Sequence, residues 1–478
     1  MSQQKYDLVI IGSGPGGYVA AVRAAHAGLR TAIVEKDPMF GGTCLWRGCI
    51  PTKALLENAA VWDQTRHARE FGISVGDIKL DFAAVMQRKT KIVRKLGKGV
   101  EGLIKSNKVD SHEGYGRLAG GGKVSVTGKD GKVTTLEAKN VLLATGSAPR
   151  MLPGLKADGT RIVTSDEILD IDAIPGSLVV IGSGAVGVEF ASIFHRFGSK
   201  VTLVELLPRV VPLEDEEVSA ELEKVFRRQG MQVHTGVSAG DIRLSGSRIT
   251  ATLTPAAAAA VPNGPARAKN PTPVEADMLL VAIGRRPLSD DLGLDGTKVT
   301  LEKGFIKVDG YMRTSEPGVY AIGDVVPTPP LAHVASAEGI LAVDHMSGRE
   351  VQPINYDHVP GATYCEPEIA SIGLTEAKAQ ERGFDVKVGR FPFSHSSKAP
   401  ILGHTDGFVK MIADAKYGEL LGVHIIGPRA TELIAEAGVA LRTEATVEEM
   451  YRTIHPHPTL SEAVLEAAHG VFGRAIHS

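Results

Sequence analysis

Short apolar runs that end in glycine recur along the chain and predict the buried strands of parallel sheets. The first run, Tyr6 to Ile11, is followed by a glycine-rich stretch and then by an alanine-rich segment that reaches His26. A second apolar run, Thr31 to Val34, comes directly after it. This order predicts a strand, a helix and a second strand, which together form a βαβ unit.

The turn after the first strand has the sequence Gly12-Ser13-Gly14-Pro15-Gly16-Gly17. Gly12 permits a tight turn, Gly14 lets the backbone approach a pyrophosphate, and Gly17 lets the helix pack closely on the strand. Glu35 ends the second strand, 18 residues beyond Gly17, where a carboxylate can accept hydrogen bonds from ribose hydroxyls. A GxGxxG run alone is weak evidence, but here the strand, the helix and the acid all follow in order.

The same pattern returns in the middle of the chain. A strand run, Leu178 to Ile181, precedes a second fingerprint with Gly182, Gly184 and Gly187, and the helix that follows reaches about Phe197. A further strand run, from 200 to 204, ends at an acid, Glu205, which again lies 18 residues beyond the last glycine. Two complete fingerprints predict two bound dinucleotides.

Glu205 also bears on which nicotinamide nucleotide binds. A carboxylate at this position accepts a hydrogen bond from the ribose 2′-hydroxyl and repels a 2′-phosphate, so it favours NAD over NADP. Arg209 is a weaker signal in the opposite direction, because arginine can bind a 2′-phosphate. We interpret Arg209 as a surface residue that follows the turn.

Two more apolar runs predict strands that extend or adjoin the two sheets. They are Val141 to Thr145, closed by Gly146, and Met278 to Ile283, closed by Gly284.

A third run, Val319 to Ile322, leads into Gly323 and Asp324. A carboxylate at such a strand end can bind a cofactor sugar, and an aspartate of a simple turn is the alternative.

Two segments are expected to be exposed. The stretch from Thr254 to Pro273 is rich in proline and alanine without amphipathic periodicity, which predicts a loop inserted in the second nucleotide-binding domain. The basic run from Lys89 to Lys98 is most simply the solvated face of a helix.

Composition limits the classes of protein to consider. The 478 residues are enough for about three domains with buried cores. The formal net charge of −2 provides no overall basic field to attract nucleic acid. No apolar run is long enough to predict a membrane span, and no secretion signal is recognisable. We therefore expect a cytoplasmic protein with no nucleic-acid partner, no membrane span and no metal site.

Cys44 and Cys49 form a CxxxxC pair soon after the first fingerprint, in a chain with only three cysteines. On a regular helix their Cα atoms would lie about 8.6 Å apart, whereas a disulfide needs less than about 7 Å. A bridge therefore requires a distorted helix or one that begins there, and Gly48 and Pro51 allow this. In a reducing cytosol a disulfide is usually transient and catalytic. The pair indicates a catalytic dithiol beside a redox cofactor, with two unrelated buried thiols as the alternative.

The C-terminal segment HPHPTLSE, from His455 to Glu462, precedes a helical run to about residue 468. Pro458 keeps His457 out of helical geometry, so its imidazole is expected on a loop. Glu462 has two interpretations, since it can complete a capping box with Thr459 or orient His457 as a base. Dithiol chemistry needs a base because the thiolate is the attacking species. We expect His455 to position the loop.

With all these motifs in view, the chain resembles the pyridine nucleotide disulfide oxidoreductases, and most closely the members that oxidise dihydrolipoamide. The stretch GGTCLWRGCIPTK looks like the redox-active segment of the family, and ATGSAP and AIGD look like its FAD-domain signatures. YCEPEIASIGLTE and HPHPTLSE look like its dimerisation domain. The likeness covers nearly the whole chain.

This resemblance implies an α/β fold with two Rossmann-like dinucleotide-binding domains and a C-terminal α+β dimerisation domain. The expected divisions are an FAD-binding domain (1–150), an NAD-binding domain (151–277), a central domain that completes the FAD site (278–350) and an interface domain (351–478). It also implies FAD and NAD as cofactors and a homodimer. The implied partner is the lipoyl domain of a 2-oxoacid dehydrogenase or glycine cleavage complex.

The implied activity is oxidation of protein-bound dihydrolipoamide to lipoamide, with reduction of NAD, through a Cys44–Cys49 disulfide and FAD. By resemblance, Cys44 is the thiol that exchanges with the substrate, and Cys49 is the thiol that faces the flavin. His457 and Glu462 become the base and its orienting carboxylate. The active site is then shared between two chains.

The resemblance also assigns residues around the cofactors. Lys53 and Glu189 look like the ion pair beside the flavin N5, Asp324 would bind FAD, and Glu205 would bind the NAD ribose. The His457–Pro458 bond is the best candidate for a cis peptide, by this similarity and because only X-Pro bonds adopt cis at modest cost.

Three features depart from the usual family pattern and bear on substrate access and partner choice. They are the segment from Phe393 to Pro400, the Trp46-Arg47 pair between the cysteines, and Cys365. Cys365 is expected to be an inert buried thiol.

Three rival functions remain. A glutathione reductase-like enzyme uses NADPH and typically has arginines where this chain has Glu205. Mercuric reductase typically adds a C-terminal cysteine pair, which is absent here. A protein that binds flavin and NAD without dithiol turnover is disfavoured by Cys44 and Cys49.

Overall fold

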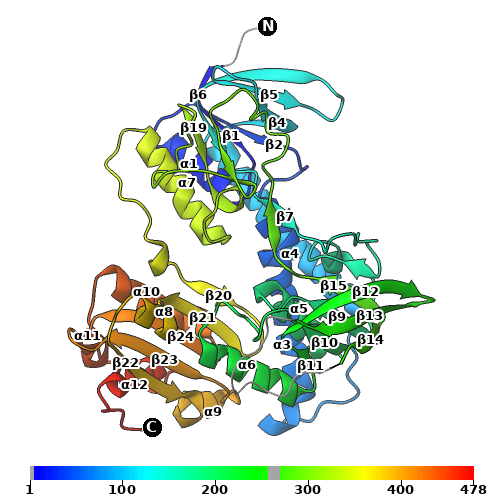
Figure 1. Ribbon diagram of the computed structural model, residues 1–478, viewed down its shortest axis with the longest axis vertical. Helices are drawn as coiled ribbons and strands as arrows, with labels where there is room; N and C mark the ends of the chain where they lie inside the picture. The colour runs from blue at the N-terminus through cyan, green and yellow to red at the C-terminus, as the bar shows by residue number, and fades with distance from the viewer. Residues whose placement is uncertain (1–4, 257–269, 478) are drawn as a thin grey trace. The chain divides into compact units, whose positions relative to one another are not determined.

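The computed structural model describes residues 5–256 and 270–477, and Figure 1 shows the elements in chain order. The chain divides into two compact units. Unit 1 consists of Met1–Ala54, Ala83–Arg150 and Arg285–Tyr356. Unit 2 consists of Leu55–Phe82, Met151–Gly284 and Asp357–Ser478. Among the described residues, no helix is long and apolar enough to cross a membrane. The finer division into four domains stays a prediction.

Unit 1 is built on a seven-stranded sheet in the order β3-β2-β1-β6-β5-β4, with β19 also paired to β6. The predicted first strand is β1 (Lys5–Ile11), and it pairs in parallel with β2 (Thr31–Glu35) and β6 (Val133–Leu143). The others are β3 (Asp110–Glu113), β4 (Tyr115–Leu118), β5 (Lys123–Thr127) and β19 (Val319–Ala321). Central strands buried on both faces explain the continuous apolar runs.

Two helices, α1 (Pro15–His26) and α7 (Ala332–Met346), lie side by side against this sheet (Figure 1). Glycines make their contact close, because a Cβ at Gly339 would lie 2.8 Å from the carbonyl oxygen of Gly16. Arg23 and Asp344 join the two helices by an ion pair of 2.6 Å. The first βαβ unit therefore forms as predicted, with a helix from a distant part of the sequence beside it.

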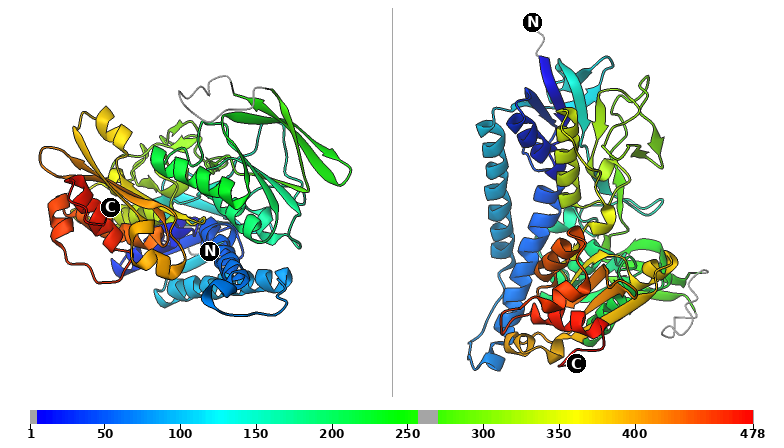
Figure 2. Two further views of the ribbon diagram at one scale, coloured as in Figure 1. Left: turned by 90° about the horizontal axis from the view of Figure 1, so that it is seen from below. Right: turned by 90° about the vertical axis from the view of Figure 1, so that its left-hand side faces the viewer.

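Three more helices of the N-terminal part are α2 (Gly42–Arg47), α3 (Cys49–Arg66) and α4 (Phe82–Ser106), and the right-hand view of Figure 2 shows α3 and α4 as the two long blue helices. The basic run from Lys89 to Lys98 lies in α4, as predicted. Lys89 itself is an exception to the solvated face, since it is buried. Shorter elements are η1 (Ala68–Phe71), β7 (Ser147–Pro149) paired with β16 (Arg285–Pro287), β17 (Leu301–Glu302) paired with β18 (Phe305–Ile306), η3 (Gly323–Val325) and η4 (Tyr356–His358).

Unit 2 repeats the nucleotide-binding architecture. Its parallel sheet has the order β11-β10-β9-β15-β8, formed by β11 (Gln232–His234), β10 (Lys200–Val204), β9 (Ser177–Ile181), β15 (Met278–Val281) and β8 (Ile162–Val163). The accompanying helices are α5 (Ala185–Arg196), α6 (Glu216–Gln229) and the short η2 (Glu167–Asp170). Both strands predicted to adjoin β1 and β9 do so, as β6 and β15.

A three-stranded antiparallel sheet packs its apolar residues against the parallel sheet of unit 2. Its strands are β12 (Val237–Ser245), β13 (Arg248–Pro255) and β14 (Thr272–Ala276). The predicted loop from Thr254 to Pro273 is therefore wrong at both ends, because Pro255 ends β13 and Pro273 lies in the edge strand β14. Proline is tolerated at strand ends and edges. The centre of that predicted loop, residues 257–269, lies outside the described residues.

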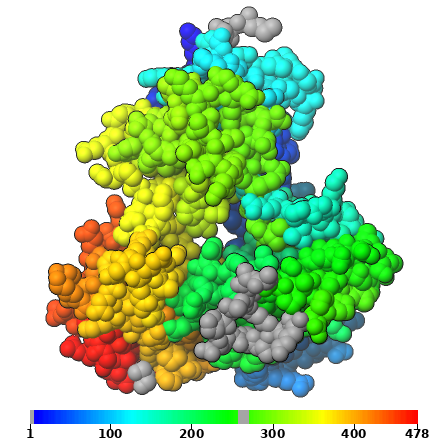
Figure 3. Space-filling view, viewed as in Figure 1, coloured from blue at the N-terminus to red at the C-terminus, as the bar shows by residue number. Residues whose placement is uncertain are grey.

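The C-terminal part of unit 2 forms one continuous block, coloured yellow to red in the space-filling view (Figure 3). Its antiparallel sheet has the order β20-β21-β24-β23-β22, formed by β20 (Gly361–Thr363), β21 (Glu368–Gly373), β24 (Leu420–Gly427), β23 (Phe408–Asp414) and β22 (Val386–Pro392). Its helices are α8 (Glu376–Glu381), η5 (Phe393–His395), α9 (Lys398–Leu402), α10 (Ala430–Arg442), α11 (Val447–Arg452) and α12 (Glu462–Val471). Helices packed on an antiparallel sheet make this part α+β, as expected.

Candidate active site

Both glycine fingerprints form the turn between a parallel strand and the helix that follows it, β1 to α1 and β9 to α5. Gly12 and Gly182 adopt φ values of +102° and +99°, and a Cβ on either would lie 2.3 or 2.4 Å from a main-chain carbonyl oxygen. A Cβ at Gly17 or Gly187 would lie 2.0 or 1.9 Å from the carbonyl oxygen of the first glycine. The protein's own conformation and packing therefore require the first and last glycine of each fingerprint.

The middle glycines, Gly14 and Gly184, have a different explanation. Their backbones are extended, with φ and ψ of −60° and −178° at Gly14 and of −67° and 179° at Gly184, and nothing lies within 4 Å of a Cβ built on either. Each is the N-cap of the helix that follows, where unpaired amides favour an anion. A side chain there would project into the open space at the helix N-terminus. These residues therefore fit a pyrophosphate at each loop, as the sequence predicted.

The two acids at the strand ends make the same contacts. Ser13 donates to Glu35 Oε2 through its main-chain nitrogen (2.9 Å) and Oγ (2.5 Å), and Ser183 donates to Glu205 Oε2 in the same way at 2.8 Å. The second oxygen of each carboxylate accepts from the main-chain N–H two residues on. Neither serine was predicted to have a role, although their identical place in the two fingerprints was an available signal.

Asp324 lies in η3, where two other segments of unit 1 reach it. Ser147 Oγ donates to Asp324 Oδ2 at 2.5 Å and accepts from Arg285 Nε at 2.6 Å. Gly146 and Gly284 immediately precede these residues and adopt φ values of +72° and +106°, so each marks a turn after its strand. The carboxylate is thus held by a relay of two residues, of which Ser147 belongs to the ATGSAP motif and Arg285 belongs to no motif described above.

The cysteine pair lies at a break between two helices. Cys44 belongs to α2 and Cys49 begins α3, with Gly48 between them at φ −146° and ψ −112°. Pro51 lies in the first turn of α3, where a missing N–H is tolerated. The interrupted helix expected from the spacing is confirmed, and both cysteines are half-buried thiols.

The pKa of Cys44 depends on its partner thiol. The pKa of Cys44 lies well above its ordinary value, chiefly because of its hydrogen bond with Cys49, and then because of burial and of negative charge at Cys49. Lys53 acts in the opposite direction. Burial and the contact with Cys49 thus disfavour a thiolate at Cys44. This agrees with the division of roles that the resemblance implies.

The unusual residues between the cysteines have partners within unit 1. Trp46 Nε1 donates to the carbonyl oxygen of Phe40 at 2.7 Å, and its ring packs with the core beneath the sheet. Arg47 forms an ion pair of 2.6 Å with Asp37. A Cβ built on Gly97 of α4 would lie 2.6 Å from Cζ2 of Trp46, so the indole needs a glycine at this point of the helix.

Replacing Gly97 with Ala should lower the free energy of unfolding by about 1–3 kcal/mol, and with it the melting temperature, because the rigid indole of Trp46 must move. Gly99→Ala is the matched control on the same helix, because nothing lies within 4 Å of its Cβ. That control should raise stability by up to about 1 kcal/mol. Thermal unfolding of both variants checks the prediction, and a stabilised Gly97→Ala protein would contradict the packing described here.

Lys53 and Glu189 fall in different units, Lys53 on α3 and Glu189 on α5. Glu189 is buried and its Oε1 accepts from the main-chain nitrogen of Tyr364 at 2.9 Å. The ion pair that the resemblance implies stays a prediction.

His457 and Glu462 are brought together at the start of α12. His457 Nδ1 lies 2.9 Å from Glu462 Oε1, and Glu462 Oε2 accepts from the main-chain nitrogen of Thr459 at 2.8 Å. Partial burial raises the pKa of Glu462. The hydrogen bonds from the Thr459 main chain and the His457 imidazole lower it by more, so the pKa lies below its ordinary value. One carboxylate therefore makes both contacts that the sequence left as alternatives. The capping box is only half formed, because Thr459 Oγ1 contacts Pro456 and Ser461 instead.

The loop that carries His457 is held by its neighbours. The His457–Pro458 peptide bond is cis, as predicted, and a second cis bond, not predicted, precedes Pro367. The His455 ring nitrogens each lie 2.8 Å from an oxygen, one from Thr453 and one from Glu436. His455 thus has the contacts of a residue that positions the loop, while the His457 side chain is 70% exposed.

Two other departures from the family pattern are part of the core. Cys365 is fully buried with Sγ donating to the carbonyl oxygen of Pro367 at 3.2 Å, and burial raises its thiol pKa well above the ordinary value. Phe393 is fully buried and requires glycine opposite it, because a Cβ at Gly427 would lie 2.4 Å from its ring.

Comparison with known proteins identifies the family. The pyridine nucleotide-disulphide oxidoreductase family matches residues 6–339, and its dimerisation domain matches residues 359–468. Dihydrolipoyl dehydrogenase of Bacillus subtilis is 45% identical over 99% of both chains. That of Chlorobaculum tepidum is 46% identical over 97% of this chain and 96% of its own.

Solved structures with the same fold support this family assignment. LpdA from Mycobacterium tuberculosis has a TM-score of 0.87 at 29% identity, covering 97% of this chain and 99% of its own. The flavoprotein disulfide reductase RclA from Escherichia coli has a TM-score of 0.85 at 25% identity, covering 98% and 99%. The expected fold class is confirmed, and the chain belongs to the pyridine nucleotide-disulphide oxidoreductase family.

Proposed function

We propose that the chain is a dihydrolipoyl dehydrogenase, which oxidises protein-bound dihydrolipoamide to lipoamide and reduces NAD to NADH. The observation that carries the proposal is the Cys44–Cys49 pair at a helix break, beside the first of two dinucleotide loops. Relatives at 45% and 46% identity over nearly the full length are dihydrolipoyl dehydrogenases.

The cofactors are FAD and NAD, as membership of the family implies. FAD supplies a two-electron acceptor for the dithiol and a hydride donor for NAD. The residues proposed to hold FAD are Gly12, Gly14, Gly17, Glu35, Gly146 and Asp324, with Lys53 and Glu189 near the flavin. Those proposed to hold NAD are Gly182, Gly184, Gly187, Glu205 and Gly284.

His457 is proposed as the base. With Nδ1–H donating to Glu462, the lone pair at Nε2 can accept a proton from a dihydrolipoyl thiol. The thiolate then attacks Cys44 Sγ, which forms a mixed disulfide and releases Cys49 as a thiolate. The second substrate thiol displaces Cys44, closes the lipoyl disulfide and passes its proton to Cys44. Two electrons thus reach the cysteine pair, and the raised pKa of Cys44 suits it to keep the proton.

The proposed assembly is a homodimer that serves a lipoyl domain of a 2-oxoacid dehydrogenase or glycine cleavage complex. The dimerisation domain matched at residues 359–468 supports the homodimer. A reducing compartment such as the cytoplasm suits the proposal, because disulfides there are usually transient and catalytic.

A paired assay tests the substrate. Purified protein should oxidise dihydrolipoamide with NAD and leave glutathione disulfide unreduced with NADPH. The reverse result would support the glutathione reductase-like alternative. Anaerobic titration with dithionite should consume electrons for two redox centres, the flavin and the disulfide, whereas a flavin- and NAD-binding protein without dithiol turnover would consume electrons for the flavin alone.

NAD should be preferred over NADP, and Glu205→Ala should narrow this preference. Loss of a hydrogen bond to a charged acceptor is worth about 1.5–3 kcal/mol, so kcat/KM with NAD should fall about ten- to a hundred-fold. Glu205→Gln keeps an acceptor for Ser183 but removes the charge. The change in kcat/KM with NADP in this variant therefore measures the repulsion between the carboxylate and a 2′-phosphate. Comparable efficiency of the unaltered enzyme with NAD and NADP would contradict this role.

A further inference from the structure

The loop that follows Glu205 returns to the second glycine fingerprint. The carboxylate of Glu205 accepts from Ser183, and the main-chain nitrogen of Val211 donates to the carbonyl oxygen of Ser183 at 3.0 Å. The segment 206–211 is therefore tied at both ends to one residue of the proposed NAD loop. Arg209 lies within this short closed segment, four residues beyond the acid proposed to bind the ribose.

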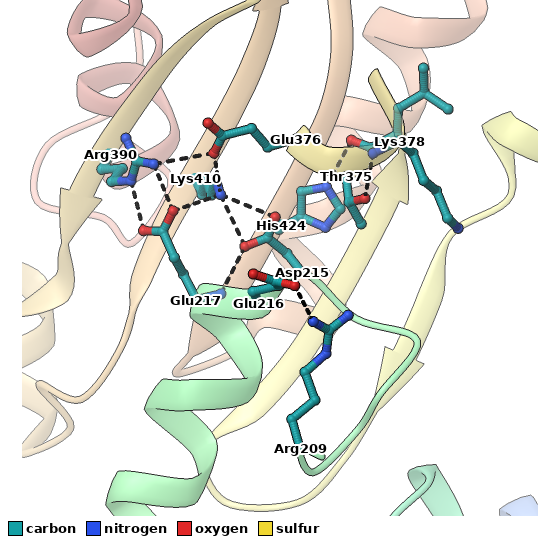
Figure 4. A network of polar contacts seen from close by, with 11 residues as sticks. Arg209, Asp215, Glu216, Glu217, Thr375, Glu376, Lys378, Arg390, Lys410 and His424 are labelled. Carbon is teal, nitrogen blue, oxygen red and sulfur yellow. Dashed lines mark hydrogen bonds and ion pairs between the residues drawn. The ribbon is translucent and has the colours of Figure 1, made fainter. Parts of the chain in front are cut away.

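The guanidinium of Arg209 is held by its own chain. Nη1 forms an ion pair with Glu216 at the start of α6, and Nη2 donates to the carbonyl oxygen of Pro212 at 3.3 Å. Figure 4 shows the arginine side chain directed toward this glutamate. The interpretation of Arg209 as a plain surface residue is therefore incomplete, because the side chain is two-thirds buried and has a charged partner.

Glu216 is fixed by its two neighbours, although its own side chain is exposed. Asp215 caps α6, and both of its carboxylate oxygens accept hydrogen bonds of 3.0 Å from the buried Nζ of Lys410. Glu217 pairs with Arg390 at 2.6 and 2.7 Å and with Lys410 at 2.7 Å. These contacts, Arg390 first, lower the pKa of Glu217 to about 2. The backbone of Glu216 is thus anchored on both sides (Figure 4), so pairing with Arg209 has to order only the two side chains.

We propose that Glu216 is a specificity-determining residue, which holds Arg209 away from the 2′-position of the bound nucleotide. A 2′-phosphate is a dianion for which arginine is the best protein partner. In this chain a 2′-phosphate would be repelled by Glu205. It would also have to compete with Glu216 for Arg209, the one arginine of segment 206–211. This inference rests on the proposed use of NAD, and it adds a second carboxylate to the discrimination against NADP.

The test compares two probes that differ only by the 2′-phosphate, namely 5′-AMP and 2′,5′-ADP. Their dissociation constants are measured by calorimetry on the FAD-loaded protein. Glu216→Gln should strengthen binding of 2′,5′-ADP relative to 5′-AMP by about two- to five-fold, the range expected for an exposed ion pair. The gain should shrink at high salt and disappear in the double variant Arg209→Gln/Glu216→Gln.

Glu223→Gln is the matched control, because Glu223 pairs with Arg227 further along the same helix at 2.8 Å. It removes the same charge without releasing Arg209, so the ratio of the two constants should stay unchanged. The proposal is overturned if Glu216→Gln leaves that ratio unchanged, if the control shifts it equally, or if the gain survives loss of Arg209.

The outcome is separable from the proposed function, since neither probe involves dihydrolipoamide. Normal binding of 5′-AMP by a protein inactive on dihydrolipoamide would overturn the substrate assignment alone. Failure of the unaltered protein to bind 5′-AMP would overturn the nucleotide assignment and this inference together.

Discussion

Replacing Cys49 with Ser is expected to abolish dihydrolipoamide oxidation, with a loss of at least about a thousand-fold, as removal of an essential catalytic residue typically gives. A serine cannot form the disulfide that accepts electrons from the substrate. The long-wavelength absorbance that a thiolate gives beside an oxidised flavin should also be absent from the reduced enzyme. FAD should stay bound, because no residue proposed to bind FAD has been changed.

Cys44→Ser should give a different protein. It should also lose activity with the substrate, but Cys49 should still perturb the flavin spectrum, because the resemblance to the family places the Cys49 thiol against the flavin. The matched control is Cys365→Ser, since a buried serine hydroxyl can donate to the same carbonyl oxygen as the thiol. That variant should keep its activity. If the Cys44 and Cys49 variants have the same spectra, the division of roles is wrong.

Mixing two inactive variants, Cys49→Ser and His457→Gln, is expected to restore activity. The cysteine pair lies in unit 1, and His457 and Glu462 fall within the matched dimerisation domain. If each active site takes its cysteines from one chain and its histidine from the other, a mixed dimer has one intact site. His457→Gln alone should lose about a hundred- to ten-thousand-fold, the usual contribution of a positioned base.

Denaturing and refolding the two variants together with FAD should recover about one quarter of wild-type activity. Half the dimers are mixed when assembly is random, and each has one working site of two. The control is each variant refolded alone, which should stay inactive. A shared site is ruled out if mixed, FAD-loaded dimers are present and no activity returns.

The sequence predicted the nucleotide-binding units because their signals are local. Strands buried on both faces require continuous apolar runs, and the first glycine of each fingerprint has a φ that disfavours other residues. The helix break at the cysteine pair was predictable for the same reason, since i to i+5 spacing does not suit a disulfide on a regular helix.

Local signals failed where a distant segment decided the outcome. The end of β13 and the start of β14 were assigned to a loop because the segment is rich in proline and alanine without periodicity, although Pro255 is a strand end and Pro273 lies on an edge strand. Lys89 was expected on a solvated face but is buried, because helical periodicity alone does not say how much of the helix the rest of the protein covers.

The sequence by itself determined the two glycine turns before α1 and α5 and the helix break at the cysteine pair, because these depend on residue type and short-range spacing. Only the tertiary structure decided the partners. Arg285 reaches Ser147 across 138 positions, and Lys410 reaches Asp215 across 195. Many charged residues could form such pairs, and the choice among them depends on which segments pack together, a property that no short stretch of sequence contains.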